Sequence, residues 1–380
     1  MIWVTWRHHR TSLVVSLGFL AALAVIVLSS GAIIKSGGQA QLFGSPLSCF
    51  DDITAICTAE TALTLTTVVA TALPVFLGVL IGVTVFSRDV EQGTHVLGLT
   101  QSVSRTRWFW TRVLIVFLPI SVASSLLGFA LQWARSLPDN SRYAFVAGRS
   151  TFVEISNLSY PLFQSSGLVL GAYTFMALML GAALALLVRS SIGAMAITMV
   201  GVVAILAAFQ LVSRPDYAEP SVRTSPVAGF SSYYSSDTSI PAVNWELAQG
   251  YVDLRGNWVD VKYDECTWGG SGDEDPYDQR PEETGAEYGL RMDVLSAQQN
   301  REMEICLREH GVDHYEVRYH SADRFWRFQF TEAALVLILS GLFLLPALWV
   351  YDASSRDSAG DRATVSWLMF APVIEQPLVG

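Results

Sequence analysis

Six long apolar runs, separated by polar segments, dominate this sequence. Each run has about 20 residues or more, which is the length that an α-helix needs to cross the hydrocarbon core of a bilayer. Only 15% of the chain is charged and 51% is hydrophobic, which excludes an ordinary soluble globule. The sequence therefore predicts a multi-pass membrane protein. The six predicted spans are Leu13–Ile34, Ala62–Phe86, Thr111–Trp133, Leu162–Val188, Ile192–Val212 and Phe328–Tyr351.

Basic residues beside the spans predict their orientation, because loops that stay in the cytoplasm are enriched in lysine and arginine. With a cytoplasmic N-terminus, the inner segments carry Arg7, Arg10, Arg88, Arg105, Arg107, Arg189, Arg356 and Arg362. The outer loops before the fourth span carry Lys35, Arg135, Arg142 and Arg149. The bias is imperfect, but it favours both termini in the cytoplasm.

The four cysteines support the same orientation. Cys49 and Cys57 precede the second span, and Cys266 and Cys306 precede the sixth, so all four fall in segments that this topology places outside. Disulfides persist on that side of a membrane. Cys49 with Cys57 can close a short loop, and Cys266 with Cys306 can join two parts of a larger domain. Neither these spacings nor the histidines match a zinc pattern, so no metal site is predicted.

Residues 213–327 form the largest segment between two spans, and we expect a small α+β domain there. Between Arg214 and Arg327 the sequence has 22 acidic and 11 basic residues, so the net charge of the chain, −10, belongs to this domain. An acidic balance argues against nucleic-acid binding. After an opening loop rich in Ser, Tyr and Pro, the pattern predicts a hairpin around Gly-Asn, a helix that ends at Gly311 and a closing strand. Their ranges are Tyr251–Arg255 with Trp258–Tyr263, Glu287–His310 and Tyr315–Tyr319.

Two other segments are open to two interpretations each. In residues 1–12, helical spacing brings Trp3, Trp6 and Arg10 to one side, with Arg7 beside them, which is typical either of an interfacial helix or of a simple anchor. The second span contains threonines and a proline. Threonine hydroxyls can bond back to their own helix, or they can line a helix interface or a substrate path. The residues considered for such a path are Thr64, Thr67, Thr71 and Pro74.

The chain lacks the sequence signatures of an enzyme. It has no GxxxxGK[ST], GxSxG or HExxH motif, which argues against an ATPase, an α/β-hydrolase or a zinc protease. The spans show almost no ionisable residues at their centres and no cluster of acids of the kind that proton-coupled pumps use. The energy for any transport would therefore come from another subunit.

The segment Phe86–Trp108 interrupts the apolar pattern on the expected cytoplasmic side. Asp89, followed by Gln92, resembles a capping-box start, and Gly98 can end the resulting helix. Ser104 can then cap the helix that enters the third span. From the residues alone, the segment is either a structural connection between two spans or a short helix to which another protein binds.

The stretch RDVEQGTHVLGLTQSVSRTRWFWTR resembles the loop after the second span of ABC-2-type transporter permeases. In that family the loop forms a coupling helix, which docks in a cleft of the ATP-binding subunit. Asp89 stands for the usual Glu and Arg112 for the usual closing Lys. The other matching residues are Glu91, Gly93, Thr94, Gln101, Ser104, Arg105 and Trp108. WVTWRHHR, LVRSSIGAMAITM and YHSADRFWRFQFTEAAL resemble the actinobacterial branch of the same permeases.

This resemblance implies an all-α polytopic fold with six transmembrane helices of ABC-2 type. The small extracellular α+β domain, expected from its own sequence pattern, is then inserted between helices 5 and 6. It implies a permease subunit that pairs with a second copy in the bacterial plasma membrane. A separate subunit would bind ATP and Mg²⁺, because this chain binds no cofactor of its own. Leu97 on the coupling helix and the Arg189 turn would add contacts to that subunit.

The expected organisation has five parts, and one different function stays open. A non-transporting sensor or immunity subunit, whose extracellular domain binds a ligand or protein, would have the same six spans. An intramembrane enzyme is a third class, but no motif favours it. The parts are 1–12 (interfacial helix), 13–212 (spans 1–5, with coupling helix 87–104), 213–327 (extracellular domain), 328–351 (span 6) and 352–380 (cytoplasmic tail).

Overall fold

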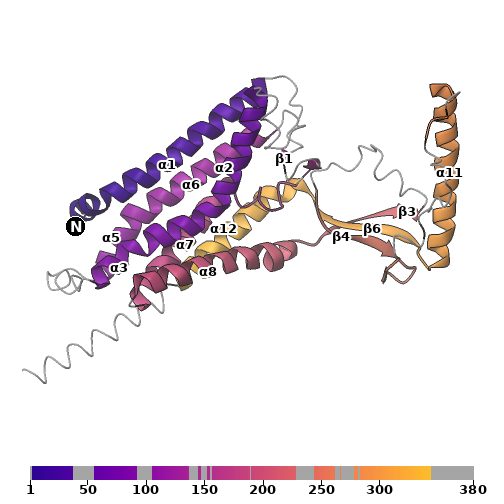
Figure 1. The fold of residues 1–380 in the computed structure, drawn as a ribbon. Coiled ribbons are helices and arrows are strands. Elements are labelled where there is room, and N and C mark those ends of the chain that lie inside the picture. The colour runs from indigo at the N-terminus through magenta and orange to yellow at the C-terminus, as the bar shows by residue number, and fades with distance from the viewer. Residues whose placement is uncertain are drawn as a thin grey trace, which may run out of the picture.

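The structure is a computed structural model of the whole chain, with a helical bundle at one end and a smaller α+β domain at the other (Figure 1). Residues 213–327 are called the inserted domain from here on. The structure describes residues 2–36, 55–91, 105–136, 144–146, 152–154, 156–188, 190–227, 244–261, 266, 278–280 and 283–343.

The six predicted spans are confirmed, since six helices among the described residues are long and apolar enough to cross a membrane. Three of the spans contain a π-helical turn, labelled η. The first is α1 (Ile2–Ser36); the second is α2 (Ala55–Leu77), η2 (Gly78–Gly82) and α3 (Thr84–Glu91); the third is α5 (Arg105–Arg112), η3 (Val113–Phe117) and α6 (Leu118–Arg135). The fourth is α7 (Gly167–Leu187); the fifth is α8 (Ser191–Ala208) with η4 (Phe209–Ser213); the sixth is α12 (Phe325–Leu342).

Two helix starts differ from the sequence prediction. Helix α1 runs without interruption from Ile2, so residues 2–12, expected as a separate interfacial helix, continue into the first span. Trp3 and Trp6 are exposed on it, and the Arg7 guanidinium lies 5.3 Å from the Trp3 ring. The expected helix start at Asp89 is wrong, because Asp89 lies inside α3, which begins at Thr84. Helix α3 continues to Glu91, past the predicted end of the second span at Phe86, and Ser87 just beyond that end is buried.

Helix α7 is the central helix of the bundle and is buried over most of its surface. Its sequence is apolar all round, as expected of a helix with neighbours on every side. It packs against α2, α6, α8 and α12. Neighbouring helices approach it closely through small residues: a Cβ on Gly181 would lie 2.5 Å from the Gly78 carbonyl oxygen, and one on Gly82 would lie 2.8 Å from that of Leu178. Such contacts matter because lipid supplies no hydrophobic force between helices.

The second and third spans each contain a proline close to a π-helical turn. Pro74 is inside α2, four residues before η2 begins at Gly78. Pro119 follows η3 by two residues, at the start of α6. A proline removes one backbone hydrogen bond and crowds the carbonyl four residues earlier, which for Pro119 is that of Ile115 in η3. The turn η2 follows Pro74 instead of preceding it, so this effect does not account for η2. The π-helical turns η2 and η3 thus lie next to α3 in the second span and next to α5 in the third.

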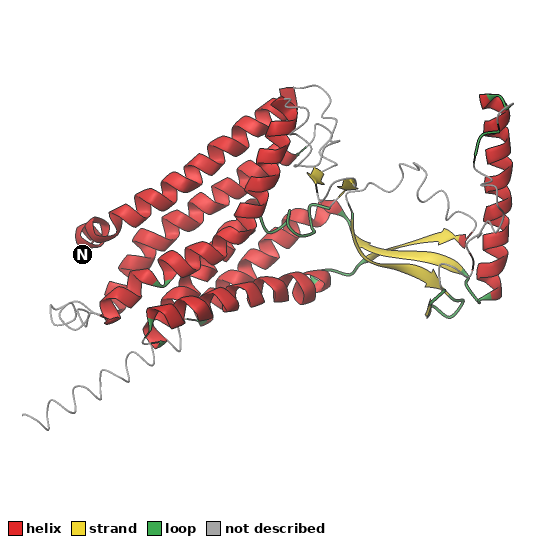
Figure 2. Ribbon diagram, in the orientation of Figure 1, coloured by secondary structure: helices red, strands yellow, loops and turns green. Residues whose placement is uncertain are grey.

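The inserted domain contains a four-stranded antiparallel sheet of order β3-β6-β4-β5 (Figure 2). The predicted hairpin pairing is confirmed, since Tyr251 pairs with Val259 and Val252 with Trp258, but its first strand runs from Trp245 to Val252 instead of from Tyr251 to Arg255. Gly256 takes a positive φ of 84° in its turn. Strand β3 lies where the sequence analysis expected a loop, and it pairs with β6 along its whole length. The strands are β3 (Ser221–Pro226), β4 (Trp245–Val252), β5 (Trp258–Val259) and β6 (His314–His320).

Helix α11 (Gly285–Glu309) runs crosswise to the strands at the far end of the inserted domain (Figure 1). Thr284 and Glu287 form a capping box at its start, and Gly311 follows its end with a φ of 81°. The predicted helix is therefore confirmed within two residues at each end. A small cluster of Val227, Leu307 and Val312 packs it against the sheet. A further pair of strands, β1 (Ala144–Val146) and β2 (Phe152–Glu154), precedes the fourth span.

Replacement of Gly181 by valine should destabilise the bundle by about 1–3 kcal/mol, because the added side chain cannot fit against the Gly78 carbonyl. The matched control is Gly18→Val on α1, where a Cβ would meet nothing within 4 Å. Thermal unfolding of the purified proteins in detergent measures the difference. Equal melting midpoints for the two variants would contradict the packing argument.

Candidate functional site

The predicted coupling segment lies between α3 and α5. Asp89 and Glu91 are in the last turns of α3, Arg105 is the first residue of α5, and Trp108 follows on α5. Residues 92–104 lie outside the described residues, so the structure does not test the predicted coupling helix itself. The other residues expected to contact an ATPase that fall outside the described part are Gly93, Thr94, Leu97, Gln101, Ser104 and Arg189.

An aromatic clamp, which consists of Phe86, Phe109, Phe117 and Arg112, joins the two helices that flank this segment. The buried Phe86 ring stacks on Phe109 at 5.2 Å and meets the edge of Phe117 at 6.2 Å. Arg112 Nη1 donates a hydrogen bond of 2.8 Å to the Val85 carbonyl, and its guanidinium lies 5.5 Å from the Phe86 ring. The second and third spans are therefore tied together where the coupling segment leaves and re-enters the bundle.

At the end of the bundle near the inserted domain, Arg135 is buried among hydroxyl groups. Its Nη2 donates to Thr67 Oγ1 at 2.7 Å and to Ser165 Oγ at 3.0 Å, and its Nη1 donates to Ser166 Oγ at 3.3 Å. The sequence analysis placed Arg135 in an outer loop, whereas it is the last residue of α6 and only 4% exposed. A buried guanidinium needs such acceptors, so the hydroxyls compensate for its loss of water.

The threonines of the second span have different surroundings. Thr67 is buried, bonds back to the Leu63 carbonyl and also accepts from Arg135. Thr71 bonds back to the Val68 carbonyl, as a tolerated hydroxyl in a span does. Thr64 is half-buried and Pro74 is buried. Of the residues considered for a substrate path, Thr67 is thus the one that the structure connects to a charged group.

Arg214 and Glu332 form a fully buried ion pair between the fifth and sixth spans. Arg214 Nε donates to Glu332 Oε2 at 3.0 Å and Nη2 donates to Oε1 at 2.8 Å, with both side chains 0% exposed. The Tyr173 hydroxyl on α7 donates to the same Oε1 at 2.6 Å. The Arg214 guanidinium also lies 4.1 Å from the Phe163 ring. This geometry is the bidentate arrangement that makes Arg–carboxylate pairs strong.

The sequence analysis missed this pair. It found almost no ionisable residues at the centres of the spans and assigned no role to Glu332, which interrupts the apolar run of the sixth span. Burying a charged acid inside a span costs free energy unless the acid is paired. The presence of Glu332 in an apolar run was therefore a signal in the sequence that a buried partner exists. The partner could not be identified, because Arg214 is 118 residues earlier in the chain.

Gln329 lies close in sequence to Glu332 and His320 contacts the residue after Arg214, and both add hydrogen bonds at the same end of the bundle. Gln329 accepts from the Val169 amide at 3.1 Å and donates to the Phe163 carbonyl at 3.2 Å, so it joins α12 to the start of α7. His320, at the end of β6, lies 2.8 Å from the Pro215 carbonyl through Nε2 and 3.2 Å from Arg324 Nη1 through Nδ1. Burial lowers the pKa of His320 below its ordinary value of 6.5, and the nearby Arg324 adds to this. Both chain crossings into the inserted domain are therefore anchored to the bundle.

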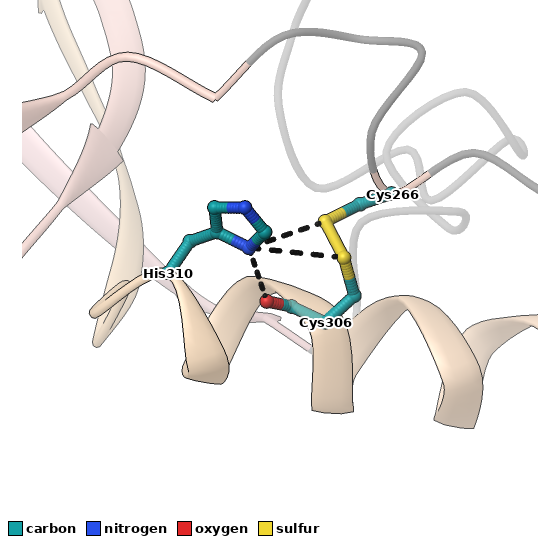
Figure 3. A group of neighbouring side chains, drawn as sticks. All are labelled: Cys266, Cys306 and His310. Carbon is teal, nitrogen blue, oxygen red and sulfur yellow. Dashed lines mark hydrogen bonds between the residues drawn. A yellow bond between two sulfur atoms is a disulfide. The ribbon is translucent and has the colours of Figure 1, made fainter.

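The predicted bond between Cys266 and Cys306 is confirmed, with the two Cα atoms 5.6 Å apart (Figure 3). These cysteines and His310 are the one group with the composition of a metal site that the described residues contain. Both sulfurs are in the disulfide, so neither is a thiolate that could bind a metal ion. Cys49 lies outside the described residues, and its predicted bond with Cys57 stays a prediction.

Removal of one partner of the buried pair should cost about 3–5 kcal/mol, because the other charge is then buried without compensation. Arg214→Leu and Glu332→Leu should each lower the melting midpoint in detergent strongly. The double variant should recover most of the loss, since two apolar side chains can fill the same space. Additive losses in the double variant would contradict a direct interaction between the two side chains.

The lowered pKa of His320 predicts lower stability in mild acid. Below about 6.5 the unfolded chain takes up a proton that the folded state resists, so stability falls with pH. The groups that face this ring are the Pro215 carbonyl, Arg324 and the carboxylate of Asp216. The melting midpoint of the native protein should drop more between about pH 7.5 and about pH 5.5 than that of His320→Gln. His314→Gln is the control, and an equal drop in native protein and His320→Gln would refute the assignment.

Comparison with known proteins agrees with this architecture. The sequence model of the family described as "ABC-2 membrane transporter related" matches residues 17–214, more than half of the chain. The matched region begins inside the first span, includes the second to fourth spans, the aromatic clamp and most of the fifth span, and ends at Arg214, near the start of the inserted domain. Neither the curated proteins nor the solved structures contain a match to this chain. The chain belongs to the ABC-2 membrane transporter related family.

Proposed function

We propose that this protein is the membrane-spanning subunit of an ATP-driven ABC exporter, coupled through residues 86–108 to a separate ATP-binding subunit. The observation that carries the proposal is the combination of family membership with a six-span bundle, whose second and third spans are clamped at the base of this segment. The family description, ABC-2 membrane transporter related, supports a permease subunit, and the resemblance to ABC-2-type permeases implies a separate ATP-binding partner. ATP and Mg²⁺ would bind to that subunit and not to this chain.

The aromatic clamp gives this proposal a mechanical basis. A force on Glu91 or Arg105 would reach the clamp within two turns of helix, because α3 ends at Glu91 and α5 begins at Arg105. The stacked Phe86 and Phe109 rings and the Arg112 bond make the two helices move together. Beyond them, η2 packs against α7 through glycine contacts. The movement would therefore pass from the docking segment to the central helix of the bundle.

The path and the partner copy are further parts of the proposal. Two copies of this chain would pair, and substrate would pass along their interface, lined by spans two and five. Helix α8 of the fifth span exposes apolar residues such as Ile192, Val200 and Val203, which face lipid or a second copy. Thr67, beside Arg135, is the polar position of span two that such a path would meet.

We place the protein in the bacterial plasma membrane with both termini in the cytoplasm and the inserted domain outside. The basic residues that flank α3 and α5 support this orientation, because positive charges stay inside. The Cys266–Cys306 bond supports it independently, since disulfides persist in the oxidising exterior.

A sensor or immunity subunit is the second candidate function. The observation that favours it is the inserted domain itself, which has its own sheet, helix and disulfide and is anchored to three spans through Arg214, Glu332 and Tyr173. A ligand bound there could shift the spans without passing through them. The two functions differ in one result: a sensor would alter ATPase activity on binding without moving the ligand across the membrane.

Reconstitution with the candidate ATPase in liposomes tests the coupling. Glu91→Ala and Gly93→Trp should reduce co-purification of the ATPase or its activity, because they alter the docking segment, and Phe86→Ala should reduce activity without preventing docking. Leu126→Ala, exposed on α6 of the third span, is the control and should leave both unchanged. If the ATPase neither co-purifies with the native chain nor responds to these substitutions, the proposal fails.

A further inference from the structure

The Cys266–Cys306 bond has a histidine beside it that the proposed transport function does not use. His310 Nδ1 lies 3.8 Å from each of the two sulfur atoms (Figure 3). The same Nδ1 lies 2.8 Å from the carbonyl oxygen of Cys306. A carbonyl can only accept a hydrogen bond, so Nδ1 carries the hydrogen and directs it towards the carbonyl and the disulfide.

The disulfide is also accessible. Both cysteines are half-buried and His310 is exposed, so a small molecule can approach the sulfurs from solvent. Structural disulfides resist reduction when they are buried, whereas exposed ones are more often labile. A thiol–disulfide exchange is faster when the departing thiolate is stabilised, and an N–H donor beside the sulfur supplies that stabilisation.

We propose that Cys266–Cys306 is a thiol–disulfide exchange site for low-molecular-weight thiols, with His310 as the catalytic hydrogen-bond donor to the departing thiolate. The thiolate of the incoming thiol attacks Cys306 Sγ and forms a mixed disulfide there, while the bond to Cys266 Sγ breaks. Cys266 leaves as a thiolate, accepts the hydrogen bond from His310 Nδ1 and then takes a proton from solvent. A second thiol attacks the mixed disulfide, releases the oxidised thiol dimer and leaves Cys306 reduced.

The position of Cys306 decides which sulfur departs. Cys306 is in the last turn of α11, where the partial negative charge of the helix C-terminus disfavours a thiolate. Cys266 is on a separate segment of the chain, 40 residues earlier. The mixed disulfide should therefore form on Cys306, which is a specific chemical prediction. Two thiols are oxidised to one disulfide and the protein bond gains two electrons, so the exchange balances.

The consequence concerns the contact between α11 and the sheet. Among the described residues, the apolar cluster there has Val227, Leu307 and Val312 as its buried members. The disulfide spans 40 residues of sequence and joins the segment after β5 to α11. Reduction removes this covalent link and leaves the small cluster to hold the helix. An external thiol could thus loosen the far end of the inserted domain while Arg214, Glu332 and His320 keep its base attached to the spans.

The test uses the full-length protein in detergent, with the disulfide intact at the start, and reduced glutathione as the thiol. The reaction is stopped with acid, and peptide mass spectrometry quantifies free and glutathionylated Cys266 and Cys306. His310→Phe removes the donor and should slow reduction roughly tenfold, the effect of one hydrogen bond to a charged group. His310→Asn places an amide N–H near the position of Nδ1 and should recover part of the rate.

His314→Phe is the matched control, because His314 is in the same domain but bonds to Asp313 instead of the disulfide. It should react at the native rate. The proposal is overturned if His310→Phe reacts like the native protein, if His314→Phe slows the reaction as much, or if glutathione is found on Cys266 instead of Cys306. The assay contains no ATPase, so its failure leaves the proposed transport function untouched, and the reverse also holds.

Discussion

The bundle depends on the close approach of other helices to α7. In lipid, apolar side chains gain nothing by leaving one apolar environment for another, so helices associate through van der Waals contact and interhelical hydrogen bonds. Gly78, Gly82 and Gly181 allow this contact on the side of the second span, and Gly128 meets Gly167 on the side of the third. Any larger residue at these positions would separate the helices and lose the contacts of their neighbours.

The two ends of the bundle use different chemistry around this common centre. At the end where α3 and α5 lie, stacked aromatic rings and one arginine hold two spans together. At the opposite end, a polar layer built on Arg135, Arg214 and Glu332 joins the spans to the inserted domain. Aromatic contacts tolerate small displacements, whereas a bidentate buried ion pair does not. This difference is consistent with the proposed function, in which one end would move with an ATPase and the other would keep a domain in place.

Elements that depend on residues close together in the sequence were predicted correctly, whereas those that depend on contacts between distant segments were missed. The six spans and α11 were predicted correctly, because each is coded by a continuous pattern of apolar residues or caps. The hairpin at Gly256 was predicted from its local turn residues. Strand β3 was missed, since its partner β6 is almost a hundred residues later and its own sequence resembles a loop. The helix start at Asp89 was wrong because α3, which begins at Thr84 and is buried at Val85 and Phe86, continues through Asp89 to Glu91.

The sequence by itself determined that the chain crosses a membrane six times, that it has no nucleotide-binding motif and that an acidic domain lies between the last two spans. These properties follow from composition and from short-range periodicity, which each segment carries alone. Only the tertiary structure decided that Glu332 meets Arg214, that Arg135 is buried among hydroxyls and that His310 lies against the disulfide. Such contacts join residues of different segments, and their energy depends on burial and on atomic distances, which exist only once the helices have packed.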